Sequence, residues 1–337
     1  MPTTHAAPIL TADSKGWQQG HACVPFRHVL VCLDGSASAE AAVPLAAHLA
    51  RMDDARVTVL RVLEAPQHGA DLRPTDPIAW EIAREQARSY VGRIAERFEA
   101  AGVPAEARLA EGSAAREIAA VGAATSADLT VLSTHGEGGE DCSCVGRTAQ
   151  RILDLAEGAL LVVPSHPRKP ASPLLPLRRL FVPLDGSLRA EFALPTALRL
   201  ARAEGAEIVL AHVALDPIRT EMLFAEDDLV LARELADRLE ARAGAYLERV
   251  RTRLSMTGPS ARKALVRAAD HRAGLVSLAT REQPDLVVLS AHGSVCDTRR
   301  RFGSVTSYFI AHSPAPVLAE LGKGPDGVGA VFRSVAI

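Results

Sequence analysis

The sequence has few aromatic residues, little net charge and no long apolar run. Aromatic residues make up 4% of the 337 residues, and the formal net charge is −2 at pH 7. A chain with few aromatic rings and near-neutral charge offers little to nucleic-acid bases or anionic lipid. No apolar run reaches the length of a membrane span. We therefore expect neither nucleic acid nor a membrane as a partner.

The sequence also lacks the signs of a disulfide framework, a metal centre and a secretory signal. Its five cysteines are an odd number with irregular spacing, and Cys142 and Cys144 form a C-x-C pair without a second pair at zinc spacing. Cys32, near the end of an apolar run, is predicted to be a small buried residue. The first residues have no basic start followed by an apolar segment, so we expect a cytoplasmic location.

The sequence contains the same pattern twice. From His28 it reads HVLVCLDGSASAEAAVPLAAHLARM, and from Arg179 it reads RLFVPLDGSLRAEFALPTALRLARA. Further along, ADLTVLSTHG (127–136) matches PDLVVLSAHG (284–293). Between the copies, prolines recur every third residue from Pro164 to Pro176, as in a semi-rigid polyproline spacer. We predict an N-terminal tail (1–25), a first domain (26–165), a linker (166–177), a second domain (178–322) and a C-terminal tail (323–337).

Within a copy, short runs rich in Val, Ile and Leu alternate with helical patterns. The first copy predicts strands at 28–33, 56–63, 105–112, 128–133 and 159–164, and helices at 37–52, 77–102 and 113–126. Ser36 or Ser38 is expected to cap the first helix, which Pro44 either kinks or begins. Nearly all-apolar strands that alternate with helices indicate an α/β fold, namely two tandem doubly wound domains, each with a five-stranded parallel sheet.

In such a sheet, ligands bind at the carboxyl ends of the strands, where the strand order reverses. The turn after the first strand (Asp34 or Asp185) and the loop after the fourth strand (from Ser133 or Ser290) reach this edge. The second loop leads through Gly293 to Gly303 and Ser304 at an apparent helix start. Glycine permits close approach and a helix start offers free N–H groups, so this loop predicts a phosphate site.

The strand-one aspartate, the His-Gly pair after strand four and the pattern Gly-x2-Gly-x9-Gly-Ser/Thr resemble the universal stress protein family in its tandem-domain form. The resemblance covers nearly all of both halves. It implies a fold of the adenine-nucleotide alpha-hydrolase type and, in the branch that keeps the glycines, binding of ATP, with Mg²⁺ as an open question. It also implies that the edge strands ALLVVP and APVLAEL pair, so that the domains form an internal pseudo-dimer and two chains form a homodimer.

The second copy departs from this pattern only at its first position, where Ser290 replaces glycine. The resemblance implies that Asp185 binds a ribose hydroxyl. It also implies that Pro183 and Leu184 contact adenosine and that Val213 and Leu289 contact the base or ribose. The phosphates are implied to contact the backbone N–H groups of Gly293, Gly303, Ser304 and Val305. We therefore expect ATP mainly in the second domain.

In the first copy, Arg147 stands where a small hydroxyl residue would touch phosphate. The loop before it carries three acidic residues, whereas the second loop carries one aspartate against three arginines (Glu137, Glu140, Asp141; Asp297, Arg299, Arg300, Arg301). These charges favour phosphate in copy two and oppose it in copy one. Residues 299–301 are read as a solvated loop, an anion clamp or a partner contact.

Several alternatives stay open from the sequence. The glycine and serine loops also fit simple turns with helix caps, and His135 and His292 fit loop-shaping residues better than catalytic ones. No P-loop, G-x-S-x-G or H-E-x-x-H motif is present, so no catalytic residue is assigned and at most slow ATP hydrolysis is expected. The functions considered are an ATP-binding stress-response regulator with an unknown protein partner, a nucleotide-free interaction protein, and a weak enzyme on an adenylated substrate.

Overall fold

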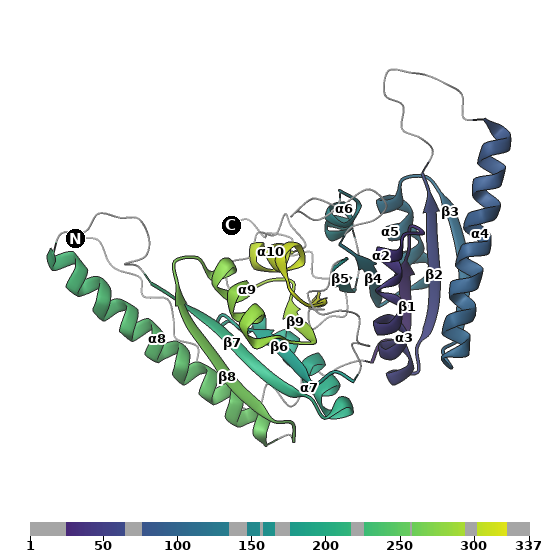
Figure 1. Cartoon of the computed structure of the whole chain (residues 1–337). Coiled ribbons are helices and arrows are strands. Elements are labelled where there is room, and N and C mark those ends of the chain that lie inside the picture. The colour runs from purple at the N-terminus through teal and green to yellow at the C-terminus, as the bar shows by residue number, and fades with distance from the viewer. Residues whose placement is uncertain are drawn as a thin grey trace, which may run out of the picture.

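The structure is a computed structural model. It describes residues 25–64, 76–134, 147–155, 158–165, 176–216, 226–256, 258–293 and 302–321. Figure 1 shows strands in the middle of each half with helices around them. Several residues discussed from the sequence lie outside these ranges, among them His135, Gly136, Cys142, Cys144, Gly146 and the run 299–301.

The first half alternates strands and helices in the predicted order. Its strands are β1 (His28–Cys32), β2 (Arg56–Leu63), β3 (Ala105–Glu111), β4 (Leu129–Ser133) and β5 (Ala159–Val163). Its helices are α2 (Ala37–Glu40), α3 (Val43–Met52), α4 (Pro77–Ala100), α5 (Ala114–Thr125) and α6 (Arg147–Leu155). The single helix expected over 37–52 is therefore two, because Pro44 occupies the first turn of α3 and cannot continue a preceding helix. Ser36 caps α2, with its hydroxyl accepting from the N–H of Ala39.

The second half repeats this arrangement. Its strands are β6 (Arg179–Pro183), β7 (Glu207–Leu215), β8 (Ala261–Ala268), β9 (Leu286–Ser290) and β10 (Val317–Glu320). Its helices are η1 (Ala190–Phe192), α7 (Ala193–Glu204), α8 (Glu226–Ser255), α9 (His271–Glu282) and α10 (Ser304–His312). Asp270 caps α9 by accepting from two backbone N–H groups, and Gly205 ends α7 in the left-handed conformation that glycine adopts without strain.

The ten strands form one sheet, in the order β3-β2-β1-β4-β5-β10-β9-β6-β7-β8. Pairing is parallel within each half, and among the described strands only β5 and β10 pair antiparallel, with Val162 opposite Val317. The edge strands expected to pair therefore do so inside one chain. Because β5 and β10 pair with each other, the edge strands of the described sheet are β3 and β8. A homodimer through strands would have to use one of these.

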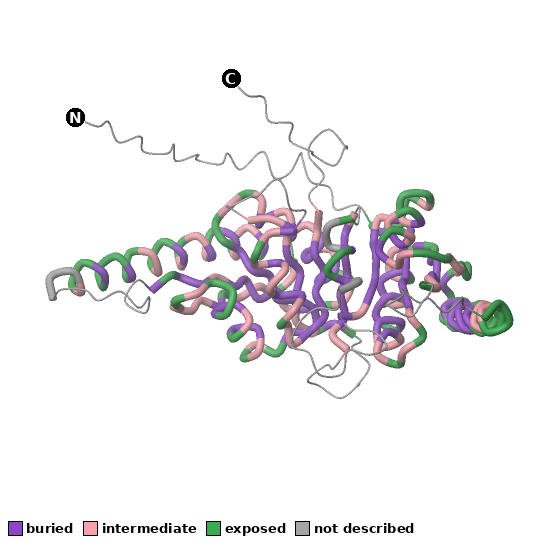
Figure 2. Tube along the Cα trace, turned by 90° about the horizontal axis from the view of Figure 1, so that it is seen from above, coloured by how far each residue is buried: buried purple, intermediate pink, exposed green. Residues whose placement is uncertain are grey.

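Helices cover both faces of the sheet, which is the doubly wound arrangement expected from the sequence. One buried cluster contains side chains from α3, α4, α7 and α8, and the other contains side chains from α5, α6, α9 and α10. Figure 2 shows the strands as the buried centre of the molecule and the outer turns of the long helices as exposed.

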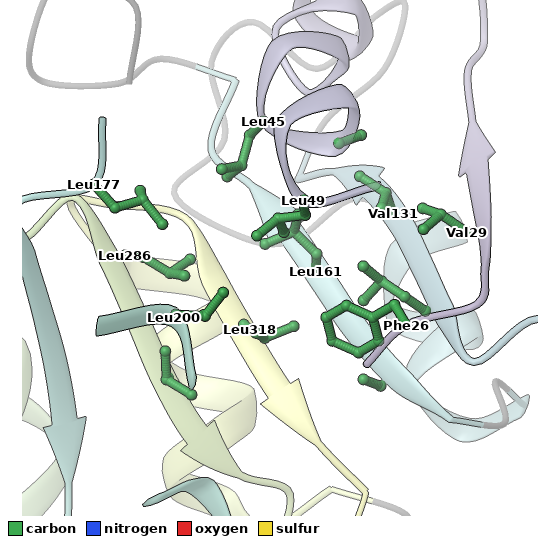
Figure 3. Close-up of a cluster of buried hydrophobic side chains, with 14 of the residues drawn as sticks. Phe26, Val29, Leu45, Leu49, Val131, Leu161, Leu177, Leu200, Leu286 and Leu318 are labelled. Atoms are coloured by element: carbon green, nitrogen blue, oxygen red, sulfur yellow. The ribbon is translucent and has the colours of Figure 1, made fainter. Parts of the chain in front are cut away.

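The first of these clusters runs without interruption across the seam, the joint between β5 and β10. Leu161 of β5 and Leu318 of β10 are fully buried there, together with Leu49 of α3 and Leu200 of α7. Figure 3 shows these side chains gathered around the seam. Burying a leucine side chain contributes about 2 kcal/mol, so this shared core stabilises the joint between the halves.

Two polar side-chain contacts close the seam on the side of α3 and α7. His48 and Glu204 approach to 2.8 Å between Nε2 and Oε1, and Arg199 donates to Asp53. Each acid also accepts the backbone N–H that precedes its own first strand, from Phe26 to Asp53 (2.9 Å) and from Leu177 to Glu204 (3.1 Å).

These contacts repeat because the two halves align. His48 and Arg199 occupy equivalent positions, and so do Asp53 and Glu204. Each half thus supplies one basic and one acidic side chain to the contacts with the other half, which is the reciprocal pattern of a two-fold interface.

Replacing Arg199 by alanine tests how much the contact between Arg199 and Asp53 contributes to the free energy of unfolding. The Asp53 side chain is only 4% exposed, so the variant leaves a buried carboxylate without its guanidinium. We expect the free energy of unfolding to fall by about 3 kcal/mol. Urea denaturation followed by circular dichroism measures it. Arg88→Ala removes an exposed pair with Glu85 and is the control, expected to change little; equal losses in the two variants would contradict the prediction.

Candidate functional site

The turn after β6 presents Asp185 at the carboxyl edge of the sheet. Its Oδ1 accepts hydrogen bonds from the backbone N–H (2.9 Å) and the hydroxyl (2.6 Å) of Ser187. Gly186 between them has φ +87°, a left-handed conformation that favours glycine. The first half builds the same turn, in which Asp34 Oδ1 accepts from Ser36 at 2.9 and 2.7 Å. The Asp-Gly-Ser motif therefore fixes the carboxylate at this edge of the sheet.

The loop after β9 passes directly against this aspartate. A Cβ atom placed on Gly293 would collide with Oδ2 of Asp185. Any larger residue at this position would have to displace the carboxylate, and glycine avoids this. The aspartate turn and the first glycine of the loop after β9 therefore lie side by side.

The start of α10 is tied back to the same strand. The N–H of Gly303 donates to the carbonyl of Ala291 (2.7 Å), and the Thr306 hydroxyl lies 3.0 Å from the carbonyl of Ser290. Gly303 is the N-cap residue, and no side chain caps the helix. The first N–H groups of α10 have no partner within the helix and carry its positive dipole end, so they suit an anion.

The predicted site residues lie in or just after three neighbouring parallel strands, β7, β6 and β9, or at the start of α10. Pro183, Leu184, Val213 and Leu289 are buried, whereas Ser290, Gly293, Gly303 and Val305 are half-buried and Asp185 and Ser304 are exposed. The side chain of Val213 packs on α9: a Cβ on Gly274 would lie 3.1 Å from it. His292 is half-buried, with its Cα 3.8 Å from the position of a Cβ on Gly303.

The sequence reasoning missed a buried carboxylate beside the turn. Glu191, in η1, is 8% exposed, and it accepts from the hydroxyl of Tyr246 (2.9 Å) and from Arg253 (2.8 Å), both on α8. Burial, together with the charge of Glu191, raises the pKa of Tyr246, so the phenol remains a hydrogen-bond donor. This cluster anchors the segment after Asp185 to the longest helix.

The repeat itself carried the signal for this cluster. Glu40 and Glu191 each lie six residues after their turn aspartate. In the first half Arg97 donates to Glu40 (2.7 Å), but the buried hydroxyl of Tyr90 has no partner at ordinary hydrogen-bond distance among the described residues. Burial raises the pKa of Tyr90 to about 12, with the charge of Glu40 adding to it.

His212, on β7, is a second residue that the sequence did not single out. Its Nδ1 lies 2.6 Å from the carbonyl of Leu184, and a carbonyl only accepts, so Nδ1 carries a proton. Burial lowers the pKa of His212, although the bond to Leu184 opposes this. The imidazole is therefore neutral at pH 7 and sits beside the aspartate turn.

Cys32 and Arg147 are two further residues that the sequence singled out. Cys32 is buried, and burial raises the pKa of its thiol, so it is a packing residue as expected. Arg147 begins α6, and the structure describes its backbone alone. The described part of the chain contains no group of three His, Cys, Asp or Glu side chains that could hold a metal ion. None of its helices combines the length and apolar character that a membrane span requires.

Comparison with known sequences decides the family. The sequence profile described as "Universal stress protein family" matches residues 25–164 and again residues 176–319. The chain belongs to the universal stress protein family, in tandem form. A universal stress protein of Mycolicibacterium smegmatis is 26% identical over 301 residues, which cover 86% of this chain and 95% of the relative.

Solved structures show the same fold. A universal stress protein from Archaeoglobus fulgidus DSM 4304 has a TM-score of 0.62 at 17% identity and covers 87% of this chain and 97% of its own. A protein of unknown function from Pseudomonas aeruginosa PAO1 has a TM-score of 0.60 at 13% identity and covers 91% and 95%. The tandem α/β architecture predicted for this universal stress protein is thus confirmed.

The hydroxyl of Tyr246 is expected to contribute more to stability than that of Tyr90. Tyr246→Phe removes one of the two partners of buried Glu191 and should lower the free energy of unfolding by about 2 kcal/mol. Tyr90→Phe removes a hydroxyl without a partner at ordinary hydrogen-bond distance among the described residues and is the matched control, with an expected change within about 0.5 kcal/mol. Urea denaturation of both variants measures this; a larger loss from Tyr90→Phe would refute it.

The neutral state of His212 predicts a pH effect. Because the folded state lowers its pKa below 6.5, the unfolded chain takes up a proton first as the pH falls through 6.5. The free energy of unfolding therefore decreases on acidification, and His212→Gln should lose this contribution. Denaturation at pH 7.5 and 5.5 tests it by the difference between wild type and variant. Identical pH dependence in the two proteins would count against a buried neutral imidazole.

Proposed function

We propose that the second half of this universal stress protein binds ATP, carried in as its Mg²⁺ complex, and that the bound nucleotide regulates which protein partner the chain engages. The observation that carries the proposal is the contact between Gly293 and Asp185, with Gly303 tied to Ala291 at the start of α10. These contacts bring an acidic group and an open helix N-terminus to one edge of the sheet.

Each part of a nucleotide would have its own partner at this edge. The N–H groups of Ser304 and Val305 at the start of α10 suit phosphate oxygens, because they point out of the helix end. The carboxylate of Asp185, which the turn fixes at this edge, suits a ribose hydroxyl. The apolar surface against the base comes from Pro183, Leu184 and Leu289. Val213 contributes only its backbone there, because its side chain packs on α9.

The proposed role is regulatory rather than catalytic. No described residue is placed as a general base or water-positioning group at the phosphate side. A bound nucleotide changes the behaviour of such a protein by favouring one conformation over another. The stress-response role and the cytoplasmic location belong to the same proposal.

Calorimetric titration of MgATP into nucleotide-stripped protein tests the site. Wild type should bind about one ATP per chain, and Gly303→Val should bind at least tenfold more weakly. The backbone of Gly303 (φ −70°) accepts valine, but its Cβ would lie 3.3 Å from the Ala291 carbonyl, at the point where phosphate approaches. Circular dichroism shows whether the variant is folded.

The matched control is Gly146→Val, the same change at the equivalent position of the first half, which should leave one ATP bound. cAMP, the ligand in one solved universal stress protein complex, is titrated as a second nucleotide. No binding of either nucleotide at millimolar concentration would refute the proposal and favour a nucleotide-free interaction protein. Equal loss of binding in both variants would refute the assignment to the second half.

A further inference from the structure

The glycines of the two Asp-Gly-Ser turns have different surroundings. A Cβ placed on Gly35 would lie 3.0 to 3.1 Å from three guanidinium atoms of Arg61. A Cβ placed on Gly186 would have no described atom within 4 Å. The backbone turn is the same, since both aspartates bond their serines alike. One turn is therefore covered by a cation and the other is open to the described surroundings.

The difference comes from a single position of the repeat. Arg61 follows Leu60, the partner of Cys32 in the β1–β2 register, and His212 follows Ala211, the partner of Pro183 in the β6–β7 register. The two side chains thus start from equivalent places. His212 is short and bonds the Leu184 carbonyl (2.6 Å), whereas Arg61 is long enough to extend over the turn.

Arg61 is held in its place by an aromatic ring. Its guanidinium carbon lies 5.3 Å from the ring centre of Tyr90, within the range of a cation–π contact. Tyr90 is 6% exposed, so its ring does not move aside readily. The guanidinium is therefore fixed between a buried ring and the glycine of the turn.

The position of Arg61 speaks against a role in holding phosphate. In the strand order β2-β1-β4, Arg61 lies on the β2 side of the aspartate turn, and the loop that leads to α6 leaves β4 on the other side. A nucleotide bound as proposed for the second half would place its base or ribose, not its phosphates, where Arg61 lies. The guanidinium occupies that space.

We infer that this position decides which half accepts a nucleotide: Arg61 closes the adenosine side of the first half, and His212 leaves that of the second half open. The inference rests on the proposed function, because it assumes that the second half is the nucleotide site. The residues that select the nucleotide-binding half, Arg61 and His212, therefore lie outside the glycine loops.

Titration of MgATP into full-length His212→Arg tests the inference. The new guanidinium should extend over Gly186 as Arg61 does over Gly35, and the affinity should fall at least tenfold. His212→Gln is the size control: a neutral amide can donate to the Leu184 carbonyl without covering Gly186, and binding should stay within about threefold of wild type. Arg61→His alters only the first half and should leave the affinity of the second unchanged.

Thermal unfolding of each variant shows whether the protein is folded. If His212→Arg does not fold, His212→Lys replaces it, with the same expected loss. Wild type that binds ATP while His212→Arg binds equally well would overturn this inference and leave the proposed function standing. Wild type that binds no ATP would overturn the proposed function and this inference together. A loss in His212→Gln as large as in His212→Arg would also overturn it, because coverage of the turn would not be the cause.

Discussion

The antiparallel ladder between β5 and β10 is the interaction on which the rest of the structure depends. It joins two five-stranded sheets into one and reverses the strand direction between Val162 and Val317. The reversal relates the halves by a local two-fold symmetry, which is why each half gives the other one base and one acid across the seam. It also covers the two apolar edges that single domains would expose, leaving β3 and β8, whose charged residues Glu106, Arg108, Arg262 and Lys263 suit an exposed edge.

The candidate site depends on the seam only indirectly. Each half builds its own crevice at the carboxyl ends of parallel strands, so the two crevices are free to diverge while the core stays common. In the second half, Gly293 passes against Asp185 and Gly186 remains open. In the first half, Arg61 covers Gly35 and rests on Tyr90. A duplicated fold thus keeps two copies of one turn and uses them differently.

The site is linked to the core through buried charge. Tyr246 and Arg253 offset the cost of burying Glu191, because an unpaired carboxylate in an apolar interior costs several kcal/mol. The link fixes the segment after Asp185 relative to α8. In the first half the hydroxyl of Tyr90 makes no such bond, and its ring supports Arg61 instead. Tyr246 thus helps to anchor the segment after the open turn, whereas Tyr90 supports the arginine that covers the other turn.

Local patterns in the sequence were sufficient to predict the fold class, the duplication and the proximity of Gly293 to Asp185. These follow from local rules: apolar runs make buried strands, glycine marks close approach, and parallel strands end at a common edge. Only the tertiary structure decided the pairing of His48 with Glu204 and of Arg199 with Asp53, the burial of Glu191, and the reach of Arg61 over Gly35. These contacts join residues far apart in the chain, and side-chain length and direction, which no local pattern encodes, determine whether they meet.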